Sequence, residues 1–245
     1  MTSGIFPTWF SDELDFYLMI FSKLLTGVPT TLQLAIYSVF MGFFFALCLA
    51  LMSRSKIGPV SALARGYIFT FRGTPMLIQL FLIYYGMGQF RPFLQEINLW
   101  WFFRDVYYCA ILGLTMNTAA YGAEIIRGGL QSVPHGQIEA ARAAGMSGFT
   151  LYRRIIFPIA LRQALPGYTN EIILMIKDTS LASLITLVEI TQLADGLRSQ
   201  TFRPVAVYTC AGVIYLLINF VVTWLVGRAE YRLNRHLRPI KVATV

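Results

Sequence analysis

Hydrophobic residues lie along this chain in long runs, and the short segments between the runs carry most of the basic residues. A helix needs about 20 apolar residues to cross the ~30 Å hydrocarbon core of a bilayer. The pattern therefore predicts an all-α integral membrane protein with about five transmembrane helices, in a single domain that covers residues 1–245. The predicted spans are residues 30–52, 62–89, 106–126, a segment that begins after Pro158 and passes through "YTNEIILMIKDTS", and residues 205–226.

Some stretches depart from this pattern. Residues 14–25 predict a short interfacial helix, which Gly27 and Pro29 end. The stretch "FRGTP" at residues 71–75 interrupts the second run, and it predicts a kink where freed backbone carbonyls satisfy the guanidinium of Arg72. Residues 178–200 receive no clear assignment from the pattern.

Composition agrees with a membrane protein and narrows the chemistry. The chain is 56% hydrophobic and 13% charged, and its net charge of +8 is spread between the apolar runs, which favours contact with a membrane surface over nucleic acid. Cys48, Cys109 and Cys210 fall inside apolar runs, where they are expected to be small buried residues. Neither His135 nor His236 has cysteines or carboxylates at metal-binding spacing, so no metal site and no bound cofactor are predicted.

The arginines and lysines fall mainly in alternate loops, which sets the predicted orientation. Residues 54–65, 127–162 and 228–245 are rich in basic residues, whereas the stretch before Lys23 has none. Because basic residues favour cytoplasmic loops, the N-terminus is expected outside and the C-terminus, a basic tail at residues 228–245, inside. No cleavable signal peptide is evident, so uncleaved spans are expected to insert the chain.

A segment rich in alanine, glycine and arginine lies on the predicted cytoplasmic side, at residues 134–158. Its pattern predicts two short helices. Pro134 suits the first turn of one helix after Ser132, and Gly145 stops that helix. Ser147 is placed to cap the second helix, which Pro158 ends or kinks.

The first of these two helices presents little side-chain bulk, so another backbone can approach it closely. Glu139 and Arg142 are one turn apart and are expected to pair with each other. One alternative is an ordinary amphipathic connector that lies on the inner leaflet. The small side chains argue against that alternative, because lipid binding favours bulky apolar faces; they are Ala140, Ala141, Ala143 and Ala144.

The sequence "EAARAAG" followed by "IIFP" resembles the EAA loop of membrane subunits of ABC importers. In that family the loop forms a coupling helix that sits in a cleft of a cytoplasmic ATPase. Phe157 replaces the leucine that is usual before the proline, which keeps an apolar side chain there. The matching residues, which the resemblance makes candidates for coupling to the ATPase, are Glu139, Ala140, Ala141, Gly145, Ile155 and Pro158.

Three longer stretches resemble permeases for polar amino acids, and among them the basic amino-acid and opine branch: "FRGTPMLIQLFLIYYG", "NTAAYGAEIIRGGLQSVPHGQIEAARAAG" and "NEIILMIKDTSLAS". The chain is similar to the M-type subunit of histidine, arginine, octopine and nopaline systems. The resemblance implies the transmembrane domain of a type I ABC importer in a bacterial inner membrane. It also implies three partners: a periplasmic binding protein, a second permease chain in a heterodimer, and an ATPase dimer that binds ATP and Mg.

This chain is not expected to be an enzyme, because it has no phosphate-binding G-x-x-x-x-G-K-[ST] loop and no cluster of nucleophile, base or metal ligands. Alternating access driven by the partner ATPase is the expected mechanism. An alternative is a secondary transporter or channel subunit driven by an ion gradient, in which Glu171 and Asp178 relay protons or cations.

Charged residues are costly inside a membrane, at roughly 2.5–3.5 kcal/mol each, so Glu171 in the fourth span is expected to have a function or a partner. It is expected either to meet a cationic substrate or to pair with an arginine on a neighbouring span, such as Arg72. Asp178 either caps the helix that follows it or contacts substrate. Thr179 and Ser180, at that helix start, are candidates to receive a substrate carboxylate.

The third span carries further polar candidates. Glu124 and Arg127 are one turn apart and are expected to form an internal ion pair. Asn117, Thr118 and Tyr121 lie on one helical face, where they either bind substrate or hold two helices together. Substrate-path candidates are thus Glu171, Asp178, Thr179, Ser180, Asn117, Thr118, Tyr121 and Arg72.

Overall fold

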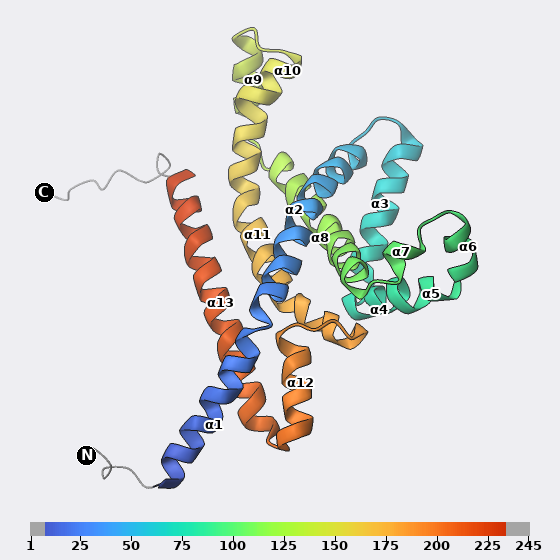
Figure 1. Cartoon of the computed structure of the whole chain (residues 1–245). Helices are drawn as coiled ribbons and strands as arrows, with labels where there is room; N and C mark the ends of the chain where they lie inside the picture. Colours follow the sequence, from blue (N-terminus) through green and yellow to red (C-terminus); the bar gives the residue numbers. More distant parts are fainter. Residues whose placement is uncertain (1–7, 234–245) are drawn as a thin grey trace, which may run out of the picture.

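A computed structural model describes residues 8–233, and within that range every regular element is a helix. The predicted all-α class is confirmed. Four long helices correspond to predicted spans and begin or end within a few residues of them, except that the last runs on to residue 233. They are α2 (Val28–Ser53), α8 (Val106–Gln131), α11 (Phe157–Asp178) and α13 (Pro204–Leu233), as Figure 1 shows.

The remaining elements are shorter. Helix α1 begins at Thr8, earlier than the predicted interfacial helix, and its buried Ile20 and Leu24 pack against α12 and α13. The shorter helices are α1 (Thr8–Leu25), α3 (Gly58–Gly73), α4 (Met76–Phe81), α5 (Met87–Gln89), α6 (Arg91–Glu96), α7 (Trp100–Phe103), α9 (His135–Ala143), α10 (Gly148–Leu151) and α12 (Ile190–Thr201), with π-helical η1 (Leu82–Gly86) and η2 (Tyr152–Ile156) and the 3-10 helix η3 (Thr179–Ile185).

Small residues allow α2 and α8 to pack closely along their length. A side chain added at Gly42 would lie 2.8 Å from the Thr118 side chain, and one added at Gly122 would lie 3.0 Å from Ala46. Helices in membranes associate through such small residues, because lipid supplies no hydrophobic force that drives them together. The pairing of Gly42 with Thr118 and of Ala46 with Gly122 also shows that the two helices run in the same direction.

Helix α11 packs against α8 in the opposite direction. A side chain added at Gly129 would lie 2.5 Å from the carbonyl oxygen of Ala160, and one added at Gly167 would lie 3.1 Å from Ile125. Segment η3 is inserted into the same bundle and completes its core. Buried residues that meet there include Leu34, Leu80, Leu114, Met175 and Ile185.

The second predicted span is sharply bent. Helices α3 and α4 meet at an angle of 108° at a break of two residues, Thr74 and Pro75, so the predicted kink is confirmed. The amide nitrogen of Gln79 donates hydrogen bonds to the carbonyl oxygens of Phe71 (2.8 Å) and Thr74 (3.0 Å). The expectation that Arg72 satisfies the freed carbonyls is therefore wrong, because Gln79 already does so.

Three stretches of the described chain are long and apolar enough to cross a membrane: Glu13–Ser53, Val106–Gln131 and Pro204–Arg228. The bent pair Gly58–Gly73 and Met76–Gln89 would be a fourth if it counts as one span. Helix α11 has 22 residues, enough for a span, but carries several charged residues. The number of about five spans and the predicted orientation remain predictions.

Two other sequence predictions concern single residues or the chain end. Cys109 and Cys210 are buried as expected, but Cys48 is exposed on α2, so its prediction is wrong. Helix α2 buries another side, through residues such as Gly42 and Ala46, and that leaves Cys48 on its surface. Most of the predicted basic tail, residues 234–245, lies outside the described residues, and so does His236.

Candidate translocation path and coupling segment

Glu171 lies in α11 and is only 6% exposed. Its carboxylate forms no hydrogen bond and no ion pair with any residue in the described range. The Tyr168 ring lies 3.1 Å from the position of a side chain added at Gly122, which places Glu171, one turn further along α11, beside the α8 turn at residues 117–121. Asp178 and Arg72 are within electrostatic reach of this carboxylate. The structure thus brings three sequence candidates from α3 and α11 towards one region.

Arg72 does not pair with Glu171, so of the two alternatives for Glu171 the pairing with Arg72 is not found. Its nearest carboxylate oxygen is Oε2 of Glu124, at 3.7 Å, and its guanidinium lies 5.4 Å from the centre of the Tyr121 ring. Arg72 and Glu124 come from different helices, α3 and α8, and that tertiary contact was not visible in the sequence. Within residues 8–233 the Arg72 side chain makes no hydrogen bond.

Glu124 and Arg127 form the predicted pair within α8. Nε of Arg127 donates to Oε1 of Glu124 at 3.0 Å, and a second guanidinium nitrogen donates to Oε2 at 2.5 Å. The remaining guanidinium nitrogen donates to the Gln131 side chain at 3.2 Å. This two-point contact satisfies Glu124 whether or not Arg72 is present.

Asn117 and Thr118 hold helices together. The Asn117 amide donates to Oε1 of Gln79 at 2.9 Å, which ties α8 to the bend between α3 and α4. Thr118 is fully buried against Gly42, and its hydroxyl has no hydrogen-bond partner among the described residues. Gln79 was missed by sequence reasoning, although a glutamine in the apolar stretch "MLIQLF" just after the break was an available signal.

The predicted helix start at Asp178 does not exist. Asp178 has helical dihedrals (φ −68°, ψ −21°) and makes no side-chain capping bond, because α11 continues directly into η3. The hydroxyls of Thr179 and Ser180 donate to the carbonyls of Ile176 (2.7 Å) and Lys177 (2.6 Å). No free backbone N–H groups of a new helix are available there for a substrate carboxylate.

A buried carboxylate that the sequence analysis missed caps α12 instead. Glu189 is fully buried, and its Oε1 accepts hydrogen bonds from the backbone of Thr191 (2.7 Å) and Gln192 (3.0 Å). Its Oε2 accepts from the Tyr215 hydroxyl at 2.7 Å and from the Thr31 hydroxyl at 3.5 Å. Glutamate is not among the favoured capping residues, so no sequence signal marked this position.

The segment at residues 134–158 forms a projection at the end of α11, opposite α1 and α12 (Figure 1). Gly145 ends α9, as predicted, with a left-handed φ of 78°. Its N–H bonds the carbonyl of Arg142 at 2.9 Å, and the N–H of Met146 bonds that of Ala141 at 3.0 Å. These two bonds define a Schellman motif, which requires a residue that tolerates positive φ.

Other details of this projection differ from expectation. Pro134 precedes α9 as its cap, and Ser147 has an extended backbone but makes no side-chain capping bond. Glu139 and Arg142 are both exposed and form no ion pair with each other, so that expected pair is wrong. The helix does not end at Pro158, because the π-helical turn η2 runs directly into α11, which has this proline in its first turn.

The projection exposes small residues, as expected for a docking surface. Glu139, Ala140 and Gly145 are exposed, whereas Ala141 is only 6% exposed and packs inward. Phe149 on α10 is 77% exposed, which is unusual for so large an apolar side chain. Ile155 and Pro158 are partly buried at the base, where η2 joins α11.

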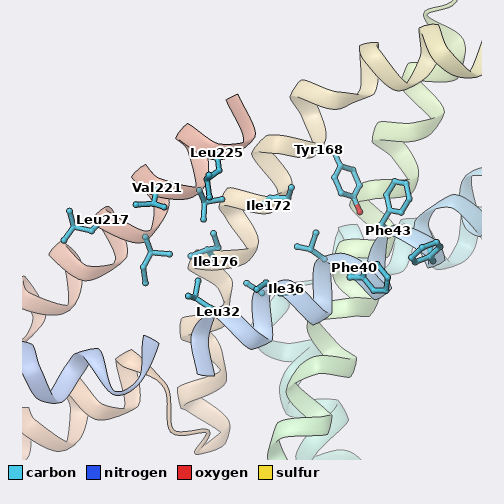
Figure 2. Close-up of a pocket in the computed structure, with 15 residues that line it drawn as sticks. Leu32, Ile36, Phe40, Phe43, Tyr168, Ile172, Ile176, Leu217, Val221 and Leu225 are labelled. Carbon is cyan, nitrogen blue, oxygen red and sulfur yellow. The ribbon is translucent and has the colours of Figure 1, made fainter. Parts of the chain in front are cut away.

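A large apolar hollow lies elsewhere. A pocket of about 830 Å³ opens between α2, α11 and α13, and the hydroxyl of Tyr168 is its one polar side-chain group. Such a pocket suits hydrocarbon, and a charged substrate would lose its hydration there without gaining partners. Figure 2 shows Leu32, Ile36, Ile172, Ile176, Val221 and Leu225 around it. Across residues 8–233, no group of three or more His, Cys, Asp or Glu side chains is placed to hold a metal ion.

Fold and site together describe a helical bundle with helices long and apolar enough to cross a membrane and with polar groups between them. The sequence model of the family described as "Binding-protein-dependent transport system inner membrane component" matches residues 38–235. The chain belongs to this family. It is a permease subunit of an ABC importer and a multi-pass protein of the inner membrane, and the family implies an ATPase and a binding protein as partners. The alternative of an ion-gradient-driven transporter is thereby set aside.

Curated relatives place the chain in the polar amino-acid and opine branch. It is 58% identical to the nopaline transport system permease protein NocM of Agrobacterium fabrum, over 92% of this chain and 94% of that relative. It is 53% identical to the octopine transport system permease protein OccM of Rhizobium meliloti, over 91% and 92%. Identity to the histidine/lysine/arginine/ornithine permease protein HisM of Escherichia coli is 42%, over 87% and 90%.

Solved structures agree with this family. The crystal structure of an amino acid ABC transporter with histidines matches with a TM-score of 0.78 and 34% identity, over 90% of this chain and 97% of that chain. An inward-facing structure of the MetNI methionine ABC transporter matches with a TM-score of 0.66 at 21% identity, which supports the fold alone. The expected type I importer fold is therefore confirmed.

Proposed function

We propose that this chain takes up basic amino acids or opines by alternating access. It acts as one of two homologous permease chains, together with a periplasmic binding protein and an ATPase dimer that binds ATP and Mg. The names of its relatives support the substrate class, since nopaline, octopine and histidine/lysine/arginine/ornithine systems are all represented.

The observation that carries this proposal is the unpaired carboxylate of Glu171. A buried carboxylate without a partner is costly in a low-dielectric interior, and a cationic substrate that passes by would relieve that cost. No described residue gives Glu171 a permanent ion pair. Glu171 is therefore the residue that contacts the cationic group of the substrate, and Asp178 is a second candidate from the same helix.

The projection at residues 134–158 is the coupling segment in this proposal. Its exposed small residues, Ala140 and Gly145, together with the exposed Glu139 and Phe149, form the surface that the ATPase holds. Ala141, Ile155 and Pro158 support that surface from inside and below. ATP binding closes the ATPase pair, moves this segment, and thereby tilts the spans to open the path outward; hydrolysis resets them.

The proposed function also sets the orientation of the chain in the membrane. The coupling segment and the basic tail lie in the cytoplasm, and the N-terminus lies outside, in agreement with the distribution of basic residues. The chain itself binds no nucleotide, metal or other cofactor. Lipid surrounds its apolar faces, and nucleic acid is not a partner.

Stimulation of ATP hydrolysis tests the proposed function. The complex is reconstituted with its partner subunits and offered candidate binding proteins loaded with arginine, an opine or glutamine. A receptor loaded with arginine or an opine is expected to stimulate hydrolysis most strongly. Equal or greater stimulation by the glutamine-loaded receptor would contradict the assigned substrate class.

A further inference from the structure

Among the described residues Arg72 has no hydrogen-bond partner, although it lies at the end of a helix in the predicted second span. Its side chain is 44% exposed, and the one ionic contact that it makes within residues 8–233, to Glu124, is long at 3.7 Å. A guanidinium has five N–H donors, and no donor of Arg72 is bonded to a residue in the described part of the chain. Such a guanidinium is able to bind an anion that comes from outside this chain.

Glu124 does not need Arg72. Arg127 already contacts both oxygens of Glu124, at 3.0 and 2.5 Å, which leaves Arg72 as the surplus cation of this group. The Tyr121 ring below the guanidinium holds it at 5.4 Å without consuming a donor. Arg72 can therefore turn to a new anion while Glu124 stays paired.

Three candidate groups face this region, the carboxylates of Glu171 and Asp178 and the guanidinium of Arg72, while the exposed Lys177 adds a positive charge within electrostatic reach of Asp178. Glu171 and Asp178 are within electrostatic reach of each other, and Arg72 is within reach of Glu171. Independent packing agrees: Gln79 bonds Asn117 and the Phe71 carbonyl, which ties the end of α3 to the α8 turn beside Glu171. Neither Glu171 nor Asp178 accepts a hydrogen bond from a described residue.

This set of charges mirrors a basic amino acid, which carries two cationic groups and one carboxylate. A neutral amino acid would leave one of the two protein carboxylates without a partner, and an amine without a carboxylate would leave the guanidinium unpaired. An unpaired charge at a partly buried site is costly, most of all at the buried Glu171, so the arrangement selects by both charges of the substrate.

We propose that Arg72 is the residue that binds the substrate carboxylate, while Glu171 and Asp178 take the two cationic groups. Arg72 leaves its long contact with Glu124 and forms a two-point hydrogen-bonded pair with the carboxylate, for which its planar guanidinium is suited. This inference rests on the proposed function and adds a specificity-determining residue to it.

Competition binding tests the inference. The purified complex of permease and ATPase subunits in nanodiscs, without binding protein, is equilibrated with radiolabelled arginine by dialysis. Unlabelled arginine and argininamide, in which a neutral amide replaces the carboxylate, are the competitors. On the unmodified complex, argininamide is expected to compete roughly 10- to 100-fold more weakly than arginine.

Variants of Arg72 test whether this residue causes the preference for arginine over argininamide. In Arg72→Gln, arginine affinity is expected to fall by the same factor and the difference between the two competitors to disappear. Arg72→Lys keeps the charge without the two-point geometry, so part of the preference should return. Arg91→Gln, an exposed arginine outside this region, is the matched control and should behave as the unmodified complex.

The possible failures are distinguishable. Equal competition by arginine and argininamide on the unmodified complex overturns the role of a carboxylate-binding residue, and this measurement does not depend on whether a variant folds. A preserved preference in folded Arg72→Gln overturns the assignment to Arg72. Binding of neutral amino acids with no binding of any basic one overturns the proposed function, and the present inference with it.

Discussion

At the scale of single residues, the account depends on Glu171. It is buried and has no hydrogen-bond or ion-pair partner among the described residues, and we propose that it contacts the positive charge of the substrate. The sequence placed Glu171 in a span but left its partner open, because contacts between helices do not follow from spacing along one helix. The same limit explains Arg72, whose contact with Glu124 on α8 joins residues far apart in the chain.

The substitution Glu171→Gln removes the charge and keeps the shape of the side chain. Uptake of arginine is expected to fall about 10- to 100-fold, as for the loss of a charge-assisted hydrogen bond, whereas uptake of a neutral amino acid changes much less. Transport assays in proteoliposomes measure both. Glu96→Gln in the exposed α6 is the control, and equal losses for both solutes in Glu171→Gln would remove this residue from the substrate path.

At the scale of elements, two bends shape the chain, and the sequence revealed them to different degrees. Gly145 was predictable, because a glycine after an alanine-rich helix is the usual signal of a left-handed stop. The bend at Thr74 and Pro75 was also visible, but its stabilising partner Gln79 was not. The capping role predicted for Asp178 was wrong, because a capping residue needs an extended backbone. At Asp178 the chain instead continues from the α-helix directly into a 3-10 helix.

Gln79 is expected to stabilise the bend between α3 and α4. Gln79→Leu leaves the carbonyls of Phe71 and Thr74 and the amide of Asn117 without their partner, at a cost of about 1–3 kcal/mol in the free energy of unfolding. Thermal unfolding of the purified chain in detergent measures the loss. Gln89→Leu, at an exposed position without such bonds, is the control; if both variants unfold alike, Gln79 has no special role.

Substitutions at Gly145 test whether the end of α9 is needed for coupling to the ATPase. Gly145→Val forces a β-branched residue into φ 78°, so the projection should distort and uptake should fall at least tenfold, with the chain still in the membrane. Gly145→Asn should retain most uptake, because asparagine tolerates left-handed backbone. Uptake and the amount of membrane-inserted chain are measured together, and full uptake by the valine variant would contradict the coupling role.

At the scale of the whole molecule, the long apolar runs were enough to predict an all-α membrane protein, whereas the cytoplasmic docking role of residues 134–158 stays a prediction. The apolar runs predict the spans because a helix that crosses a membrane must be long and apolar, whatever its tertiary contacts are. The centre of the bundle was not predictable. Segment η3 and the cap at Glu189 depend on close contact with α2, α4 and α13 that no local pattern encodes.

The most direct test of the account is a crosslink between the projection and the ATPase. A cysteine is introduced at exposed Ala140 in the assembled complex, and at exposed Ser199 on α12 as the control for the opposite end. Short thiol crosslinkers should join position 140 to an ATPase subunit and position 199 to none. Crosslinks from position 199 to the ATPase, or from position 140 only to lipid or a periplasmic protein, would contradict the idea that force enters this permease through its alanine-rich end.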